Sequence, residues 1–269
     1  MIRKILLVLL VLLGTSCSKA EQQRPSKTFD PGYQDLATVL SEYVVGENVD
    51  YAALKLNRAT LDSFIDQLAG LTSEEFEAMS RPEQLALWIN AYNGITLRSI
   101  VDAYPVESIK DIDGVWTYRK WRVAGRNVTL DHIEHKILRP DFRDGRVHFA
   151  VNCASIGCPP LLNEPFQAAT LEAQLARVSR DFVNHATRNS VDAGQKKVST
   201  SEIFSWFGED FEDVYDGSER FGHLESKEAS TLQFLYDHAD SAMAATLDSV
   251  EDWKLEYLPY DWSLNDVSK

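Results

Sequence analysis

Apolar residues recur every three or four positions in several stretches of this chain, and that spacing predicts amphipathic helices. The pattern covers residues 33–44, 57–71, 170–186 and 229–239. Residues 82–104 form a longer stretch that is apolar nearly all the way round. We expect this long helix to lie at the centre of the fold, because a helix without a polar face must be covered on every side.

The ends of the long helix are marked in the sequence. Ser80 and Glu83 form a capping-box pattern, and Pro82 is tolerated in the first helical turn. Pro105 follows the apolar stretch and cannot continue a helix, so we expect the helix to stop there.

Two asparagines interrupt this apolar helix. Asn90 and Asn93 lie about one turn apart on the same face. A buried side-chain amide must find hydrogen-bond partners. The two residues are therefore either a satisfied buried pair or part of a functional site.

Three stretches are expected to form strands. Residues 117–130 indicate a hairpin that turns at Gly125, residues 146–152 alternate in part, and residues 253–262 look like a final strand. The strand over 146–152 would deliver Cys153 to the edge of a sheet.

Two short helices complete the pattern. Residues 129–138 have Thr129 as the expected N-cap, and Pro140 is expected to end the helix. Residues 199–207 begin with a second capping box, whose first residue is Ser199.

The order of these elements predicts an α+β fold, namely a helix-rich domain with a small, mostly antiparallel sheet. No βαβ alternation, no phosphate-binding glycine motif and no linker is seen, so we expect one domain over residues 33–269. With 44% hydrophobic residues, the chain can bury a large core without needing disulfides for stability.

The first residues are typical of a secretory signal. A basic start precedes an apolar run over residues 5–13 that is too short to span a bilayer. We expect a lipoprotein-type signal over 1–16, acylation of Cys17 and a polar tether over 17–32. The chain would then be exported and anchored by lipid to a bacterial membrane, facing the periplasm or the cell exterior. The alternative is an ordinary signal with an incidental cysteine.

The net charge of −14 argues against nucleic acid as a partner, since phosphates need clustered Lys and Arg. The same charge argues against electrostatic docking on anionic lipid. The expected partners are the membrane, through the lipid anchor, and a small-molecule or peptide substrate of unknown identity.

Cys153 and Cys158 are the only cysteines after Cys17. In an exported protein they could form a disulfide, bind a metal, or leave one of them as a reactive nucleophile. The four-residue spacing lacks the two-residue spacing of most zinc knuckles, and no HEXXH sequence occurs. We therefore assign no metal and no cofactor, and leave the disulfide and the free nucleophile open.

A nucleophilic cysteine needs a base, and histidines lie upstream of it. Asp131 and His135 are four residues apart on the expected short helix, so the carboxylate could orient the imidazole. On the expected strand, His148 points away from the face that carries Val147 and Phe149, which we take as the core face.

Four motifs, in this order, resemble the family of proteins known as domain of unknown function 547: LALWINAYNGITL, LDHIEHKILRP, RVHFAVNCASIGCPPL and YLPYDWSLND. The resemblance extends over about residues 33–269. It implies that the family's motif positions are occupied here by Trp88, Asn90, Asn93, Glu134, His135, His148, Asn152 and Cys153. Some plant members carry serine where this chain has Cys158, so the resemblance implies no obligatory disulfide.

These residues suggest a cysteine-dependent hydrolase or acyl transferase. Cys153 would attack a carbonyl, His135 would take the thiol proton, and Asp131 or Glu134 would steady the ring. Asn90, or the backbone amides after the strand, would meet the developing oxyanion. This hypothesis requires the cysteine, the imidazole and both helix asparagines to surround one solvent-accessible cavity.

Two other functions remain open. One is a non-catalytic binding or scaffold module in which Cys153 and Cys158 form a structural disulfide. The other is thiol–disulfide exchange, although the pair lacks the usual C-x-x-C spacing. The aromatic end of the chain, residues 257–266, could close one wall of a pocket or fill the core at the last strand, and for Trp262 we expect the core.

Overall fold

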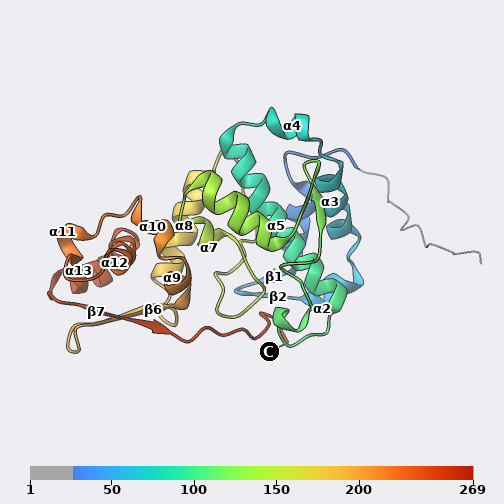
Figure 1. The fold of residues 1–269 in the computed structure, drawn as a ribbon. Helices are drawn as coiled ribbons and strands as arrows, with labels where there is room; N and C mark the ends of the chain where they lie inside the picture. The colour runs from blue at the N-terminus through green and yellow to red at the C-terminus, as the bar shows by residue number, and fades with distance from the viewer. Residues whose placement is uncertain (1–26, 269) are drawn as a thin grey trace, which may run out of the picture.

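Helix α5 (Arg81–Ala103) runs through the middle of the structure, which is a computed structural model describing residues 27–268 (Figure 1). It begins with the expected capping box, in which the Ser80 N–H and hydroxyl both donate to Oε2 of Glu83. It ends at Ala103, and its C-cap Tyr104 directly precedes Pro105. The side chains on every face of its central turns are buried, as its apolar sequence predicts.

The other helices are shorter. They are α1 (Gln34–Tyr43), α2 (Tyr51–Leu56), α3 (Ala59–Gly70), α4 (Ser73–Glu77), α6 (Leu130–Ile133), α7 (Val147–Ala150), α8 (Leu171–Val183), α9 (Glu202–Phe207), α10 (Glu209–Glu212), α11 (Ser218–Phe221), α12 (Ser226–His238) and α13 (Ser241–Asp248). A 3-10 turn (Ile109–Asp111) and a π-helix (Glu134–Phe142) join them. The strands are β1 (Val44–Val45), β2 (Asn48–Val49), β3 (Trp121–Val123), β4 (Arg126–Val128), β5 (Ser190–Asp192), β6 (Lys197–Ser201) and β7 (Lys254–Leu258).

The strands form three small sheets within the described residues. β1 pairs with β2 and β3 with β4, both antiparallel, while β6 pairs antiparallel with β5 and parallel with β7. The β3–β4 hairpin turns through Ala124 and Gly125, which both have positive φ, as expected from the glycine in this stretch. The prediction of a helix-rich α+β fold with a small, mostly antiparallel sheet is confirmed.

Close approach of two helices requires a glycine in α5. The ring of Phe64, from α3, lies against Gly94, and a Cβ atom there would meet Cε1 of Phe64 at 2.4 Å. The contact holds α3 against the central helix, and α1 in turn packs on α3.

Helices α10 to α13 and strands β6 and β7 lie on one side of α5, and α2 and α3 lie on the other (Figure 1). Rings from α7, α8, α9, α10 and α12 form one cluster: Phe149, Phe182, Phe204, Phe211 and Phe234, with centroids of neighbours 4.8–6.4 Å apart. Each buried ring contributes about 1.5–3 kcal/mol, so the cluster holds α10 and α12 against α7, α8 and α9.

After β7 the chain crosses back along the molecule (Figure 1), and we call residues 259–267 the C-terminal segment. Leu264 forms an isolated antiparallel bridge with Ser155, and Asp266 a parallel bridge with Val49. The segment therefore connects the three-stranded sheet with the N-terminal half of the chain.

The amphipathic helices expected from periodicity are all present as α1, α3, α5, α8 and α12. The strand expected over 146–152 is wrong, because Val147–Ala150 is a helical turn, α7, with all four side chains buried. Only Val151 onward is extended. A short apolar run that is buried on every side carries no reliable period, so alternation could not separate strand from helix here.

The ends of two short helices were also mispredicted. Pro140 does not end the helix over 129–138, since the π-helix continues through it to Phe142. The wider π turn accommodates a residue that lacks an N–H. Ser199 is not an N-cap but lies within β6, and α9 starts after Ser201, whose hydroxyl accepts from Ile203 N–H. Pairing with strands on both sides holds Ser199 extended.

The expected signal and Cys17 lie outside the described residues. The last part of the expected tether, residues 27–32, packs on α3: Asp30 N–H donates to Oε1 of Gln67, and Phe29 makes an edge contact with Tyr33. Between residues 27 and 268, no helix has the length and apolar content needed to cross a bilayer.

Candidate active site

The two cysteines lie in a loop directly after α7, and we call residues 152–160 the cysteine loop. Both thiols are free, and Sγ of Cys153 is 3.0 Å from Sγ of Cys158. Cys153 is partly exposed, whereas Cys158 is buried beneath it. The pair is therefore in contact but not bonded.

Asn152 shapes the start of the loop. Its Oδ1 accepts from Ala154 N–H at 2.8 Å, and its Nδ2 donates to the Pro159 carbonyl at 2.8 Å. Ala154 has a φ of 58°, a conformation that L-residues rarely adopt and that these bonds help to hold. The side chain of Asn152 thus closes the loop on itself instead of facing a ligand.

The helix asparagines clamp the chain on either side of the loop. Asn93 Nδ2 donates to the Ala150 carbonyl at 2.9 Å, and its Oδ1 accepts from Asn152 N–H at 2.8 Å. Asn90 makes the same pair of bonds with the N–H and carbonyl of Phe166, at 2.9 and 2.8 Å. Each amide thus donates to one backbone carbonyl and accepts from one backbone N–H.

The C-terminal segment holds the loop from the other side. Ile156 N–H donates to the Ser263 carbonyl and Gly157 N–H to the Asp261 carbonyl, both at 2.9 Å. A Cβ atom at Gly157 would lie 3.0 Å from the Asp261 nitrogen, so the close approach favours glycine.

This arrangement brings a tyrosine to the sulfur. The Tyr260 hydroxyl lies 3.1 Å from Sγ of Cys153 and 2.9 Å from Oγ of Ser155, and that Oγ is itself 3.2 Å from the same sulfur. Within the part of the chain that the structure describes, the hydrogen-bond partners of this sulfur are therefore Cys158, Ser155 and Tyr260. Neither His135 nor His148 is among them.

These contacts shift the pKa values of Cys153, Cys158 and Tyr260 in different directions. Hydrogen bonding from the Cys158 thiol is the largest influence on the pKa of Cys153 and lowers it; burial opposes this, and Ser155 and Tyr260 add to the lowering. Burial, followed by the neighbouring Cys153 sulfur, raises the pKa of Cys158 well above its usual value. Burial and both thiols raise the pKa of Tyr260 as well. Cys153 is thus the group that ionises first.

Cys153 opens into a cavity of about 390 Å³, which we call the thiol cavity. One wall is aromatic: Trp206 and Tyr260 have centroids 4.9 Å apart, Tyr260 and Trp262 4.7 Å, and Trp206 and Trp262 5.7 Å. Lys110 Nζ lies 4.2 Å from the Trp262 centroid. The expectation that these rings fill the core is wrong for Trp262, which is half-buried at the cavity.

The opposite wall carries acids and imidazoles, and among them is His148. Its Nε2 is 2.7 Å from Oδ2 of Asp210, its Nδ1 is 4.0 Å from Oε1 of Glu134, and its ring stacks on Phe207 at 4.0 Å. The Tyr92 hydroxyl donates to Oε2 of Glu134 at 3.0 Å. A polar chain therefore runs from the cavity wall to Asp210 behind it.

Asp210 anchors this chain. Burial raises the pKa of its carboxyl, but hydrogen bonds and charge from His148 and Arg139 outweigh burial and bring the pKa down to about 2. The carboxylate is therefore ionised at neutral pH and fixes the orientation of both neighbours.

His135 lies on the same wall. Its Nε2 is 3.5 Å from Oδ1 of Asp131, one turn before it, as the sequence spacing suggested. Its Nδ1 is 3.1 Å from Nη1 of Arg139 and must accept that hydrogen bond, because a guanidinium can only donate. The neutral ring consequently carries its hydrogen on Nε2.

The structure thus brings together five of the residues expected at a site: Cys153, Asp131, Glu134, His135 and His148. The expectation that the helix asparagines share this cavity is wrong. Asn90 and Asn93 lie behind the loop, where their side chains bond to backbone. Asn152 is likewise used within the loop. His148 comes from a helix rather than a strand and is buried, not on an open face.

Sequence reasoning missed Tyr260, Ser155, Tyr92 and Asp210. Ser155 stands two residues from Cys153, but its contact with the sulfur depends on the turn of the loop. Tyr260 belongs to an aromatic motif and lies 107 residues beyond Cys153, so no local spacing joins it to the sulfur. No local signal marked Asp210. Among residues 27–268, no group of three or more His, Cys, Asp and Glu side chains is arranged to hold a metal ion.

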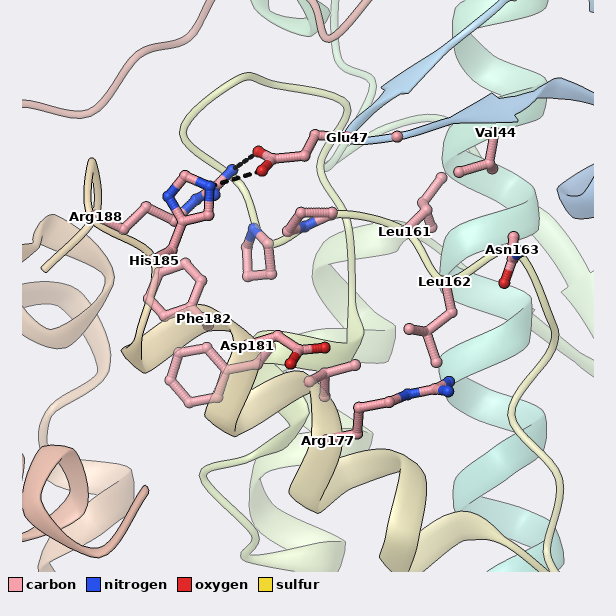
Figure 2. A pocket seen from close by; sticks show the side chains of 15 residues that line it. Val44, Glu47, Leu161, Leu162, Asn163, Arg177, Asp181, Phe182, His185 and Arg188 are labelled. Carbon is pink, nitrogen blue, oxygen red and sulfur yellow. Dashed lines mark hydrogen bonds and ion pairs between the residues drawn. The ribbon is translucent and has the colours of Figure 1, made fainter. Parts of the chain in front are cut away.

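A second cavity, of about 420 Å³, lies on the other side of the cysteine loop. Figure 2 shows Glu47 at its edge, with ion pairs of 2.7 Å to both Arg188 and His185. The buried Arg188 also donates to the carbonyls of Ile156 and Cys158, at 3.3 and 3.2 Å. The loop is therefore supported from this side by a guanidinium.

Residues 76–183 match the model of a family described as "Protein of unknown function, DUF547". No curated protein and no solved structure matches the chain. The matched stretch contains α5, both cavity histidines and the cysteine loop, while the aromatic wall formed by Trp206, Tyr260 and Trp262 lies beyond it. The family description assigns no activity. By this match, the segment over residues 76–183 belongs to the DUF547 family.

Proposed function

We propose that this protein is a cysteine-dependent hydrolase or acyl transferase with Cys153 as its nucleophile. One observation carries the proposal: the Cys153 sulfur faces a cavity while accepting hydrogen bonds that lower its pKa. The thiolate is the reactive form of cysteine, and partly exposed thiolates in such surroundings are typical of catalytic sites.

In the first step the thiolate attacks a carbonyl carbon, an S–C bond forms, and the carbonyl electron pair moves to oxygen. The hydroxyls of Tyr260 and Ser155, 3.1 and 3.2 Å from the sulfur, are the donors best placed to stabilise that oxygen. In this proposal the two hydroxyls take the oxyanion-binding role that was expected for Asn90 or for backbone amides. The N–H groups of Asn90, Cys153 and Ala154 already donate to other partners.

In the second step the C–X bond of the intermediate breaks and the leaving group takes a proton. Water supplies this proton, because a neutral imidazole does not give up its remaining N–H. His135, which carries its hydrogen on Nε2 at the cavity wall, donates a hydrogen bond to the departing group, with Asp131 orienting the ring. Water or a second nucleophile then removes the acyl group from sulfur. The aromatic wall favours a substrate with an apolar or aromatic acyl part.

The test uses p-nitrophenyl esters of increasing acyl length, followed by intact mass and peptide mapping. We expect an acyl adduct on Cys153 that is absent in Cys153→Ala. His135→Asn should lower turnover about 10²-fold and change its pH profile. An ester that is hydrolysed equally by Cys153→Ala, or no adduct with any ester, would refute the nucleophile.

The second candidate, a binding or scaffold module stapled by a disulfide, draws support from the 3.0 Å contact between the two sulfurs. Its test is thiol titration of the purified protein before any reductant is added. Finding neither Cys153 nor Cys158 free, with no later effect of reduction on any activity, would favour the scaffold.

The same proposal places the protein in the cell envelope, anchored through an acylated Cys17, on the basis of the sequence of residues 1–17 alone. Cys17→Ser should move the protein from the membrane fraction to the soluble one. Unchanged fractionation would contradict the lipid anchor.

A further inference from the structure

The two sulfurs of the cysteine loop have unlike surroundings. Cys153 lies at the thiol cavity with two hydroxyls beside it. Cys158 is only 5% exposed and receives the backbone N–H of Cys153 at 2.9 Å, with the Val151 carbonyl 3.8 Å away. One thiol is accessible to a ligand, and the other is accessible mainly to its neighbour.

From this geometry we propose that Cys153 and Cys158 act as the attacking and resolving thiols of a thiol–disulfide exchange reaction with disulfide-bonded ligands. The activity is separate from acyl transfer and requires only that Cys153 react. The ligand class is a small-molecule or peptide disulfide, one half of which enters the thiol cavity.

The distance between the sulfurs suits the second step of such a reaction. They are 3.0 Å apart, and a disulfide bond is about 2.05 Å long, so closing the bond needs a movement of about 1 Å. Bonds from Asn152, Asn93 and Arg188 hold the loop in place on both sides. The pair is consequently preorganised, and oxidation does not require the loop to refold.

The acid–base properties of the pair support the assignment of roles. The pKa of Cys153 is lowered by hydrogen bonding, above all from Cys158, while burial raises the pKa of Cys158. An attacking thiol must be a thiolate, whereas a resolving thiol can stay protonated until the mixed disulfide forms.

The reaction balances as follows. The Cys153 thiolate attacks one sulfur of R–S–S–R, forms a mixed disulfide and releases R–S⁻, which takes a proton from solvent. Cys158 then loses its proton and attacks Sγ of Cys153, forming the intramolecular disulfide and releasing the second R–S⁻. The ligand is reduced by two electrons and the pair is oxidised by two electrons.

The backbone N–H of Cys153 has a role in the reverse direction. When an external thiolate attacks Sγ of Cys153 in the oxidised pair, Cys158 leaves as a thiolate. The N–H that points at Sγ of Cys158 stabilises this leaving group. The same backbone N–H therefore assists both the oxidation and the reduction of the pair.

The experiment equilibrates the full-length protein in buffers with varied ratios of reduced to oxidised glutathione, and quenches it with acid. Peptide mapping then follows the fragment that carries both cysteines. We expect it to convert between the dithiol and the intramolecular disulfide as the ratio changes. A pair that stays reduced in excess oxidised glutathione, or stays bonded in excess reduced glutathione, overturns the proposal.

Two variants test the roles. Cys158→Ser should trap glutathione on Cys153 and prolong the mixed disulfide at least about tenfold, because its resolving thiol is missing. Cys153→Ser should take up no glutathione at the buried Cys158. Equal labelling of both variants would overturn the assigned order of attack.

Failure of this proposal can be told apart from failure of acyl transfer. An acyl adduct on Cys153 without redox cycling rejects exchange alone. Cycling without any acyl adduct rejects acyl transfer alone, and a Cys153 that reacts in neither assay rejects both.

Discussion

At the scale of single residues, the reactivity of Cys153 is set by hydroxyl and thiol donors instead of by an imidazole. Tyr260, Ser155 and Cys158 all lie within hydrogen-bond distance of its sulfur, while the cavity histidines are bonded to acids and to Arg139. The ionisation of this thiol should therefore depend more on Tyr260 than on His135.

Replacing Tyr260 with Phe tests this dependence. The variant removes one donor from the Cys153 thiolate, and a hydrogen bond to a charged group contributes about 1.5–3 kcal/mol. We expect the pKa of Cys153 to rise and alkylation by iodoacetamide near neutral pH to slow about tenfold. Tyr257→Phe, in β7, is the matched control and should react like the wild type. Equal rates in all three proteins would show that Tyr260 does not support the thiolate.

A second consequence at this scale concerns the amides behind the loop. Asn93→Ala leaves the Ala150 carbonyl and the Asn152 N–H without partners, at a cost of about 1–3 kcal/mol for each buried group. We expect chemical denaturation to show a loss of about 2–6 kcal/mol. Asn163→Ala, at an exposed position, should change stability by less than about 0.5 kcal/mol. A similar effect of both substitutions would argue against the clamp.

At the scale of elements, α10 is attached to α7 and to the π-helix through Asp210. The carboxylate bonds to His148 of α7 and to Arg139 of the π-helix. Because α10 follows α9, which carries Trp206 and Phe207, this attachment also positions part of the cavity wall.

The ion pairs of Asp210 should make the free energy of unfolding depend on pH. Asp210 has a pKa of about 2 in the folded protein and about 3.8 when unfolded, so the unfolded state binds its proton first. Its stabilisation is complete above about pH 5 and is lost as pH falls toward 2. With its side chain 20% exposed, we discount the shift to about 1–2 kcal/mol.

Urea denaturation at a series of pH values measures this dependence. Asp210→Asn should flatten the stability curve between about pH 5 and pH 2 by that 1–2 kcal/mol. Asp213→Asn, an exposed residue just beyond α10, should keep the wild-type slope. If the free energy of unfolding of Asp210→Asn fell with pH as steeply as that of the wild type, Asp210 would not be the source of the pH dependence.

The elements also show what sequence can predict. The long amphipathic helices and the cap at Ser80 were predictable because period and capping are local properties. The helical turn of α7 was not, since Val147 to Ala150 are all buried and no polar face reveals a period. Likewise β6 takes its conformation from partners on both sides, one of them more than fifty residues away at Lys254–Leu258.

At the scale of the whole molecule, the site depends on the return of the chain after β7. The C-terminal segment bonds to the cysteine loop and to β2, and its Leu264 is fully buried. Cys153, His135 and His148 could be singled out because they belong to motifs of one family. Tyr260 and Asp210 could not be assigned from sequence, because only tertiary packing brings them to the thiol and to His148.

Leu264→Ala tests how firmly the segment is attached. Removing a fully buried leucine side chain costs about 2–5 kcal/mol, and we expect a loss in this range by chemical denaturation. Val267→Ala, whose side chain is 39% exposed, is the control and should cost less than about 1 kcal/mol. A Leu264 variant as stable as this control would mean that the segment is held by its backbone alone.

The return of the chain also has a consequence for biosynthesis. Tyr260 lies 107 residues beyond Cys153, which a ribosome adding about 5–20 residues per second needs on the order of 5–20 s to complete. The hydrogen bond between Tyr260 and the Cys153 sulfur can form only after translation has passed residue 260. Chains that terminate earlier therefore lack this support for the Cys153 thiolate, although Cys158 and Ser155 are already present.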